Sequence, residues 1–364
     1  MKFIDEYRAA PAVLSALERL RRLATRPWNI MEICGGQTHA ILRFGIDQLL
    51  PEGLRLIHGP GCPVCVTPAS LIDAAIAMAR TPGVILASFG DMIRVPGTRE
   101  SLAEARSAGA GVRIVESPLA AVEMARRHPD AQVVFFGVGF ENTAPATALA
   151  VSLAARQRVQ NFSMLAAHVL VPPALEAILG AENCQVDGIL AAGHVCAVEG
   201  ERDYTRIAAR YGTPIVVTGF EPLDLLCGIL ACVRQLEGGQ AKVENAYRRA
   251  VRPAGNAKAQ ALVREVYEPA DAIWRGIGLI PASGLRLREA YSDFDALLRF
   301  PSALREDSMQ AGPCLAGQVL QGIIEPPACP AFGQACTPDH PLGAPMVSAE
   351  GACSAFYQYK RHVA

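Results

Sequence analysis

Several features are scarce in this 364-residue sequence, and each scarcity excludes a class of protein. Neither sign of charge is in excess, because 34 Lys and Arg residues balance 35 Asp and Glu residues, and the formal net charge is -1 at pH 7. This balance gives no electrostatic footprint for a nucleic-acid partner. No apolar run approaches the ~20 residues of a transmembrane helix, and no cationic leader precedes an apolar stretch. These absences predict a soluble cytoplasmic protein with no membrane partner.

Two motifs are also missing. The sequence has no phosphate-binding P-loop and no other nucleotide motif, so nucleotide use stays undecided. A single C-x-x-C pair is present, whereas zinc sites usually show two such pairs. The 11 cysteines are an odd number, and in a cytoplasmic chain we do not expect a framework of structural disulfides. The length predicts two or three domains, and the 51% hydrophobic content suffices for globular cores.

Short apolar runs alternate with helical patterns along the first two thirds of the chain. Runs such as VVFF are apolar at consecutive positions, which is typical of strands covered on both faces of a parallel sheet. The fold class predicted is therefore α/β. The expected strands are 29–34, 54–58, 84–89, 112–116, 133–138, 162–167, 188–193 and 214–219, and the expected helices are 5–24, 69–80, 118–128 and 222–237.

A weak internal repeat suggests the domain organisation. LIHGPGCPVCVTPASL resembles AAHVLVPPALEAI, ILASFG resembles ILAAGH, and both halves later carry Gly-Phe-Glu. We expect two similar Rossmann-like parallel-sheet domains that face a cleft at the carboxyl ends of their strands. The expected segments are an N-terminal helix with the first cysteine motif (1–40), the two α/β domains (41–143 and 144–240), and a helical and then loop-rich C-terminal domain (241–364).

Four cysteines crowd the loop-rich C-terminal domain. Cys314, Cys329, Cys336 and Cys353 are separated by 14, 6 and 16 residues. Four thiolates suit tetrahedral zinc, but paired C-x2-C knuckles are absent. An iron–sulfur cube accepts widely spaced ligands, so the spacing favours it slightly over zinc. Four unrelated buried cysteines are the third interpretation.

The other cysteine motifs lie near the start of the chain. Cys34 follows a strand and precedes a helix, and a helix N-terminus lowers a thiol pKa and favours the thiolate. It is a candidate nucleophile or metal ligand, or else a small core residue. Cys62 and Cys65 form the C-x-x-C pair, which is typical of thiol–disulfide exchange. A mononuclear metal site of Cys34, Cys62 and Cys65 with His39 is the alternative, and His39 is equally well explained as a satisfied, partly buried imidazole.

Four more polar residues follow expected strands or adjoin a cysteine of the C-terminal domain. Asp91 and His194 occupy matching positions of the repeat, and either is a site residue or a loop hydrogen-bonding group. Glu141 is a site carboxylate or a helix N-terminal carboxylate. Glu350 comes shortly before Cys353, where it orients the loop or is simply solvated.

The motifs together resemble the HypD family of NiFe-hydrogenase maturation proteins. The resemblance is carried by MEICGGQTH, GPGCPVC, SFGDMIRVPG, GFENT and the terminal C-x14-C-x6-C-x16-C with EGAC, in order along nearly the whole chain. It implies two Rossmann-like domains and a third domain that bears a cluster. It also implies a scaffold on which the Fe(CN)2CO group is built, together with a HypC-type chaperone and a HypE-type cyanide donor.

The resemblance further implies roles for individual residues. Cys34 would be the ligand to the iron under assembly, Cys62 and Cys65 the redox thiols, and Cys314, Cys329, Cys336 and Cys353 the ligands of a 4Fe–4S cluster. The chain departs from the family pattern where Asn142 replaces a Thr and Pro345 replaces a Cys outside these ligands. A cluster-linked thiol–disulfide oxidoreductase and a zinc-stabilised binding module are the alternative functions.

Overall fold

The first sheet gathers strands from both halves of the chain. A computed structural model describes every residue except 1, 3, 305–312 and 361–364. Its five-stranded sheet has the order β2-β1-β7-β8-β9, and every neighbouring pair in it is parallel. The strands are β1 (Trp28–Glu32), β2 (Leu54–His58), β7 (Gly188–Ala192), β8 (Ile215–Thr218) and β9 (Val243–Asn245).

The second sheet takes strands from the middle of the sequence. It has the order β4-β3-β5-β6, again with parallel pairs throughout. Its strands are β3 (Val84–Ser88), β4 (Val112–Ile114), β5 (Gln132–Gly139) and β6 (Phe162–His168). The predicted α/β class with two parallel sheets is confirmed, whereas the cleft expected between them stays a prediction.

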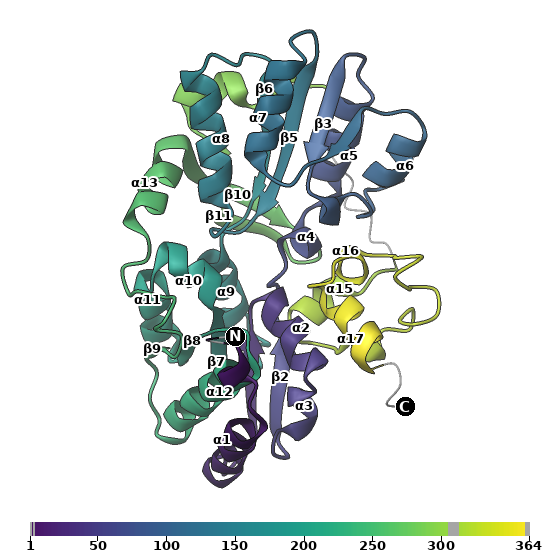
Figure 1. Cartoon of the computed structure of the whole chain (residues 1–364). Helices are drawn as coiled ribbons and strands as arrows, with labels where there is room; N and C mark the ends of the chain where they lie inside the picture. Colours follow the sequence, from purple (N-terminus) through teal and green to yellow (C-terminus); the bar gives the residue numbers. More distant parts are fainter. Residues whose placement is uncertain (1, 3, 305–312, 361–364) are drawn as a thin grey trace.

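Helices connect and cover these strands (Figure 1). Those of the N-terminal half are η1 (Asp5–Tyr7), α1 (Ala10–Leu23), α2 (Gly35–Arg43), α3 (Ile46–Leu49), α4 (Pro63–Val66), α5 (Ala69–Ala79), η2 (Gly90–Met92), α6 (Leu102–Ser107) and α7 (Pro118–Arg127). Those that follow up to the last strand of the first sheet are α8 (Ala144–Arg156), α9 (Val171–Leu179), α10 (Gly193–Glu199), α11 (Arg202–Tyr211) and α12 (Pro222–Glu237).

Both faces of each sheet are buried, which explains the consecutive apolar residues. Phe135 and Phe136 of β5 are both fully buried, and they belong to different apolar clusters on the two faces of the sheet. Ile189 and Leu190 of β7 divide between two clusters in the same way. Helices on both faces supply the covering side chains, as parallel sheets require.

The sheets divide the chain differently from the two expected halves. The repeat pairs β2, β3 and β5 with β6, β7 and β8, but β2 lies in the sheet of β7 and β8, while β6 lies in the sheet of β3 and β5. Each half therefore contributes its first repeated strand to the other sheet. The repeat records strand–loop–helix units, and such units do not specify which sheet a strand joins. Sheet membership thus departs from the boundaries 41–143 and 144–240.

The region after β9 differs from the helical start expected for the C-terminal domain (241–364). It contains α13 (Ala257–Val266), the antiparallel hairpin of β10 (Tyr267–Trp274) and β11 (Gly278–Leu287), then η3 (Glu289–Phe294) and α14 (Ala296–Arg299). Figure 1 shows the hairpin between the two sheets. It bonds to the loop after β6, since Leu170 N–H donates to the Ser283 carbonyl at 2.8 Å. The helical start expected for the C-terminal domain is confirmed in α13, whereas residues 267–287 form a hairpin that the sequence analysis did not predict.

The C-terminal segment packs beside α2 and the edge strand β2 of the first sheet (Figure 1). Its short helices are α15 (Ala316–Leu320), η4 (Pro326–Ala328), α16 (Ala344–Val347) and α17 (Ala352–Lys360). Phe356 of α17 joins Leu42 of α2 in a small apolar cluster, and α16 packs against α4. Parts of this segment, 305–312 and 361–364, lie outside the described residues.

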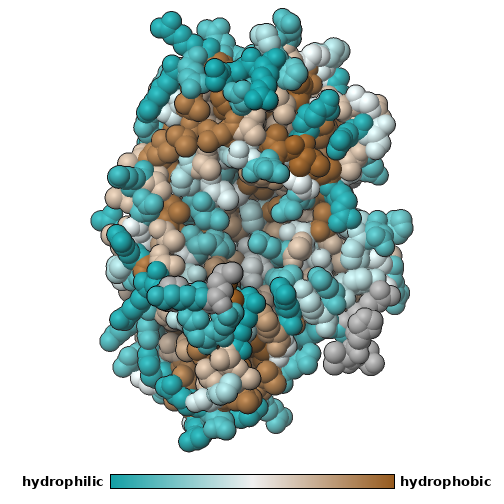
Figure 2. Space-filling view, viewed as in Figure 1, coloured by the Kyte–Doolittle hydropathy of each residue, from teal (hydrophilic) through white to brown (hydrophobic). Residues whose placement is uncertain are grey.

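The surface mixes polar and apolar residues. On the face in Figure 2, hydrophobic side chains form separate brown patches among hydrophilic residues, as is normal for folded proteins. Within the described part of the chain, every helix is too short or too polar to cross a bilayer.

Candidate functional site

Cys34 occupies the sharp connection between β1 and α2. It is the N-cap residue of α2 with extended backbone, and its side chain is 1% exposed. Its N–H donates to Glu32 Oε2 at 2.9 Å, and Gly35 N–H donates to the Gly61 carbonyl at 2.8 Å. The predicted strand-to-helix position of Cys34 is confirmed.

An aromatic pair from the first sheet faces the Cys34 thiol. His194 begins α10 directly after β7, and both of its ring nitrogens lie 3.8 Å from Cys34 Sγ. Phe220, after β8, stacks on the His194 ring at a centroid distance of 5.2 Å. Burial lowers the pKa of His194 to about 4, so its imidazole is neutral at pH 7. The carboxyl ends of β1, β7 and β8 thus meet at one thiol.

The Cys34 thiol does not have the lowered pKa that its helix position predicts. Burial raises its pKa well above the ordinary value, and the Glu350 and Glu32 carboxylates raise it further. Hydrogen bonds from the Gln37 and Gly36 backbone act in the opposite direction but are weaker. The prediction of a ready thiolate was wrong because desolvation outweighs the N–H groups of the first helical turn.

Cys62 and Cys65 form a disulfide in the loop after β2. Cys62 is the N-cap of α4, and Cys65 N–H donates to Cys62 Sγ at 3.2 Å. Both residues are buried. In this oxidised state neither sulfur is a thiolate, so the alternative mononuclear site of Cys34, Cys62, Cys65 and His39 is not assembled. Among residues that the structure describes, no three His, Cys, Asp or Glu converge to hold one metal ion.

His39 lies away from the Cys34 thiol and ties α2 to the C-terminal segment. Its Nδ1 lies 3.3 Å from the Ala349 carbonyl, and its Nε2 lies 3.2 Å from the Tyr359 hydroxyl. The two rings meet edge to face at 5.3 Å. Both nitrogens therefore have protein partners, which fits the interpretation of His39 as a satisfied imidazole.

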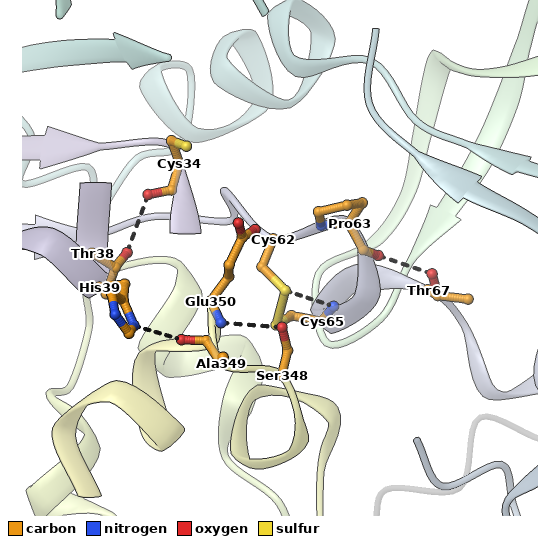
Figure 3. Close-up of a disulfide and its surroundings, with 10 residues drawn as sticks. All are labelled: Cys34, Thr38, His39, Cys62, Pro63, Cys65, Thr67, Ser348, Ala349 and Glu350. Carbon is orange, nitrogen blue, oxygen red and sulfur yellow. Dashed lines mark hydrogen bonds between the residues drawn. A yellow bond between two sulfur atoms is a disulfide. The ribbon is translucent and has the colours of Figure 1, made fainter. Parts of the chain in front are cut away.

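Glu350 brings the C-terminal segment to this site. Figure 3 shows its side chain between Cys34 and the disulfide in that view. Glu350 is exposed, yet partial burial of its carboxylate, followed by the charges of Asp91 and Glu32, raises its pKa. Asp91, in η2 after β3, is exposed. Carboxylates at strand ends of both sheets therefore raise the pKa of Glu350.

A buried polar group under Cys34 escaped the sequence analysis. The Glu32 carboxylate is fully buried and accepts hydrogen bonds from Cys34 N–H, the Thr38 hydroxyl and His58 Nδ1, the last at 2.7 Å. The strand register pairs Glu32 with His58, so the contact follows from the β1–β2 alignment. His58 also meets Phe356 of α17 edge to face at 5.3 Å. A Glu before Cys34 and a His before GPGC, both at strand ends, were the available signal.

Glu141 lies shortly after β5, and burial, followed by charges that include that of Glu141, raises the pKa of the buried Cys196. One carboxylate oxygen accepts the Val171 N–H at 2.8 Å, and the other is buried without a hydrogen-bond partner. Burial raises the pKa of Glu141 to about 8. Glu141 therefore caps α9 and not the helix that follows it, which contradicts the capping interpretation. Its role as a site carboxylate stays a prediction.

The four C-terminal cysteines share one pocket. Cys314, Cys329 and Cys353 are half-buried, and Cys336 is buried. The other lining residues are all apolar, namely Leu315, Ala316, Val319, Ala331, Phe332, Leu342 and Met346. All four cysteines line this pocket, and among the described residues no three of them form a group that could hold one metal ion. Four thiols in an apolar pocket are a donor set that an iron–sulfur cluster or zinc could use, so the interpretation of these cysteines as ligands stays a prediction.

Comparisons with known proteins show that nearly the whole chain is similar to one family of proteins. The HypD profile, described as "Hydrogenase formation hypA family", matches residues 10–360. The "Hydrogenase maturation factor HypD" of Azotobacter vinelandii is 47% identical over 370 residues, which cover 99% of this chain and 97% of that protein. The protein of the same name from Escherichia coli (strain K12) is 46% identical over 371 residues, which cover 99% of both chains.

Proposed function

Because the chain belongs to the HypD family of hydrogenase maturation factors, we propose that it is the scaffold on which the Fe(CN)2CO group of a NiFe-hydrogenase is assembled. The chain has a role in hydrogenase maturation, which implies other maturation proteins as partners. We assign these partners as a small HypC-type chaperone and a HypE-type cyanide donor. The observation that carries the proposal is the convergence of the Cys34 thiol, His194, the Cys62–Cys65 disulfide and Glu350 on one place.

Cys34 is proposed as the ligand of the iron cargo. A thiolate is a soft ligand, and metal binding displaces the thiol proton. Burial keeps the thiol protonated in the empty protein, so iron drives deprotonation at the moment it binds. The neutral His194 ring presents no positive charge that would repel the incoming Fe(II).

The Cys62–Cys65 disulfide is proposed as the redox store. Its reduction consumes two electrons and two protons and yields two thiols, and the reverse reaction releases the same electrons to the cargo or to its incoming ligand. The two electrons for the reduction come from outside the pair, and we assign the proposed 4Fe–4S cluster as their source, while solvent supplies and takes up the protons. The position of α4 directly after the β2 loop keeps the pair beside Cys34 through the Gly35–Gly61 hydrogen bond.

The four C-terminal cysteines are proposed to hold a 4Fe–4S cluster. Cys314, Cys329, Cys336 and Cys353 would supply the four thiolates from an apolar pocket. When bound, the cluster supplies one-electron transfer. Anaerobically purified protein should contain about four irons with sulfide per chain. About one zinc without sulfide would instead support the zinc-stabilised binding module.

Complementation of a host that lacks its own copy of the family tests the proposal. The natural sequence should restore active hydrogenase, and Cys34→Ala should reduce it to the level of the empty vector. Cys227→Ala is the matched control, because Cys227 lies exposed on α12 and outside the site. Full activity with Cys34→Ala, in a protein present at normal level, would contradict the assignment of Cys34.

The buried disulfide also suits a cluster-linked thiol–disulfide oxidoreductase. Such an enzyme should reduce a small disulfide without any other maturation protein. Turnover by the isolated, iron-loaded chain that Cys62→Ser abolishes would favour this second function. Absence of turnover, together with restored hydrogenase in the host, favours the scaffold.

A further inference from the structure

Arg275 lies at the tip of the β10–β11 hairpin, where three distant segments meet. Its backbone N–H donates to the carbonyl of Val66, the last residue of α4, at 2.8 Å. Its guanidinium Nη1 donates to the Pro96 carbonyl at 2.8 Å, in the loop that follows η2. The residue is therefore held by the helix that carries Cys65 and by the loop that follows Asp91.

The next residue places this hairpin tip against the C-terminal segment. Gly276 has a φ of +79°, and a Cβ added there would lie 2.8 Å from the Gly317 Cα. In the other direction, a Cβ on Gly317 would lie 2.0 Å from the Gly276 carbonyl oxygen. Two backbones thus touch directly, three residues after Cys314. This contact needs glycine on both sides and holds the residue next to Arg275 against the segment that carries Cys314.

The charge of Arg275 acts on the pocket. Burial lowers the pKa of the Arg275 guanidinium, whereas the charges of Cys314 and Asp73 raise it. The remaining walls of the pocket are apolar, and a weakly polar surrounding strengthens charge interactions.

We infer that Arg275 is a positioning residue that holds a fixed positive charge beside the four-cysteine pocket and so raises the reduction potential of the group bound there. This inference rests on the proposed 4Fe–4S cluster. Reduction adds one electron to the cluster, and a nearby cation stabilises the more negative state. The Val66 carbonyl fixes the backbone of Arg275, and the Pro96 carbonyl accepts a hydrogen bond from its guanidinium.

A redox titration of the full-length, iron-loaded protein tests this inference. The spectroscopic signal of the cluster is followed in the natural chain, in Arg275→Gln and in Arg275→Lys while dithionite lowers the potential of the solution stepwise. Arg275→Gln should make reduction about tenfold less favourable, which is about 59 mV for a one-electron couple. Arg275→Lys retains the charge and should stay within about threefold of the natural chain. Iron and sulfide contents and thermal unfolding are measured on the same samples.

The control is Arg286→Gln on the same hairpin. Arg286 is largely exposed and pairs with Glu268, so its removal should leave the potential unchanged. Equal potentials for Arg275→Gln and the natural chain, at equal iron content, would overturn the inference. If Arg275→Gln loses the cluster, Arg275→Lys should regain it, and failure to do so in a folded protein also overturns it. A natural chain without iron and sulfide contradicts the cluster itself and this inference with it.

Discussion

At the scale of single residues, Cys34 shows how burial changes the meaning of a motif. A cysteine before Gly-Gly and a helix predicts a reactive thiolate, and the position is as expected. The thiol is nevertheless buried beside Glu32 and Glu350, which favour the protonated form. The sequence reveals the helix N-terminus because neighbouring residues determine where a helix begins. The two carboxylates arrive through strand pairing and through the C-terminal segment, which no local pattern reveals.

Glu350→Gln should make Cys34 more reactive. Removing this negative charge lowers the pKa of Cys34, so alkylation of Cys34 by iodoacetamide at pH 8 should accelerate about threefold. Peptide mass spectrometry gives the rate for Cys34 separately from the other thiols. Glu325→Gln, at an exposed carboxylate paired with Arg55, should leave the rate unchanged. A rate equal to that of the natural chain would show that Glu350 does not act on this thiol.

Glu141 predicts a loss of stability at alkaline pH. Its folded pKa of about 8 exceeds the ordinary 4.5, so the folded state holds a proton that the unfolded chain has released. The stabilisation that the protonated Glu141 carboxyl gives to the folded state is complete below pH 4.5 and is lost as the pH rises through 8. Glu141→Gln keeps a neutral group and should be more stable than the natural chain at pH 9, by ~2 kcal/mol. Urea unfolding at pH 6 and pH 9 measures this difference.

The control for Glu141 is the exposed Glu123, whose change to Gln should leave the pH dependence unaltered. His168 and His194 act in the opposite direction, because burial lowers their pKa from 6.5 to about 4. Their contribution is complete above pH 6.5 and falls as the pH drops towards 4. A gap between Glu141→Gln and the natural chain that does not widen with pH would contradict the buried, protonated carboxyl.

At the scale of elements, the β1–β2 pair fixes the geometry around Cys34. A Cβ on Gly61 would lie 2.1 Å from the Cys34 nitrogen, which is backbone and cannot move aside cheaply. Gly61→Ala should therefore destabilise the protein by ~3 kcal/mol and lower its Tm by roughly 5 °C. Gly90→Ala is the control, since the nearest atom to its added Cβ is 3.9 Å away. Equal melting temperatures for the two variants would refute this close approach.

Element positions were largely predictable, whereas the later hairpin was not. The strand expected at 54–58 and the helix expected at 222–237 match β2 and α12, because a period of apolar residues marks buried strands and amphipathic helices. β10 and β11 have exposed positions along their length and lack the fully buried apolar run that marks the strands of the two parallel sheets, so the sequence analysis did not predict them. Their role in holding Arg275 beside the cysteine pocket depends on tertiary contacts alone.

At the scale of the whole molecule, the site joins segments from across the sequence. Cys34 and His194 come from opposite halves yet lie 3.8 Å apart, because β1 pairs directly with β7. Glu350 arrives from the C-terminal segment. The sequence alone shows the motifs, and their order along the chain resembles that of one family. The way in which the motifs come together in space could not be predicted, because the repeat does not reveal that each half contributes a strand to the other sheet.

The central claim is that Cys34 holds the iron while it receives its diatomic ligands, and infrared spectroscopy tests it directly. The protein is isolated from cells that make every maturation protein, together with the proposed HypC-type chaperone. The natural chain should show the cyanide and carbonyl stretching bands of Fe(CN)2CO, and Cys34→Ala should show none, while Cys227→Ala keeps them. Bands of full intensity in a folded Cys34→Ala complex would contradict the account.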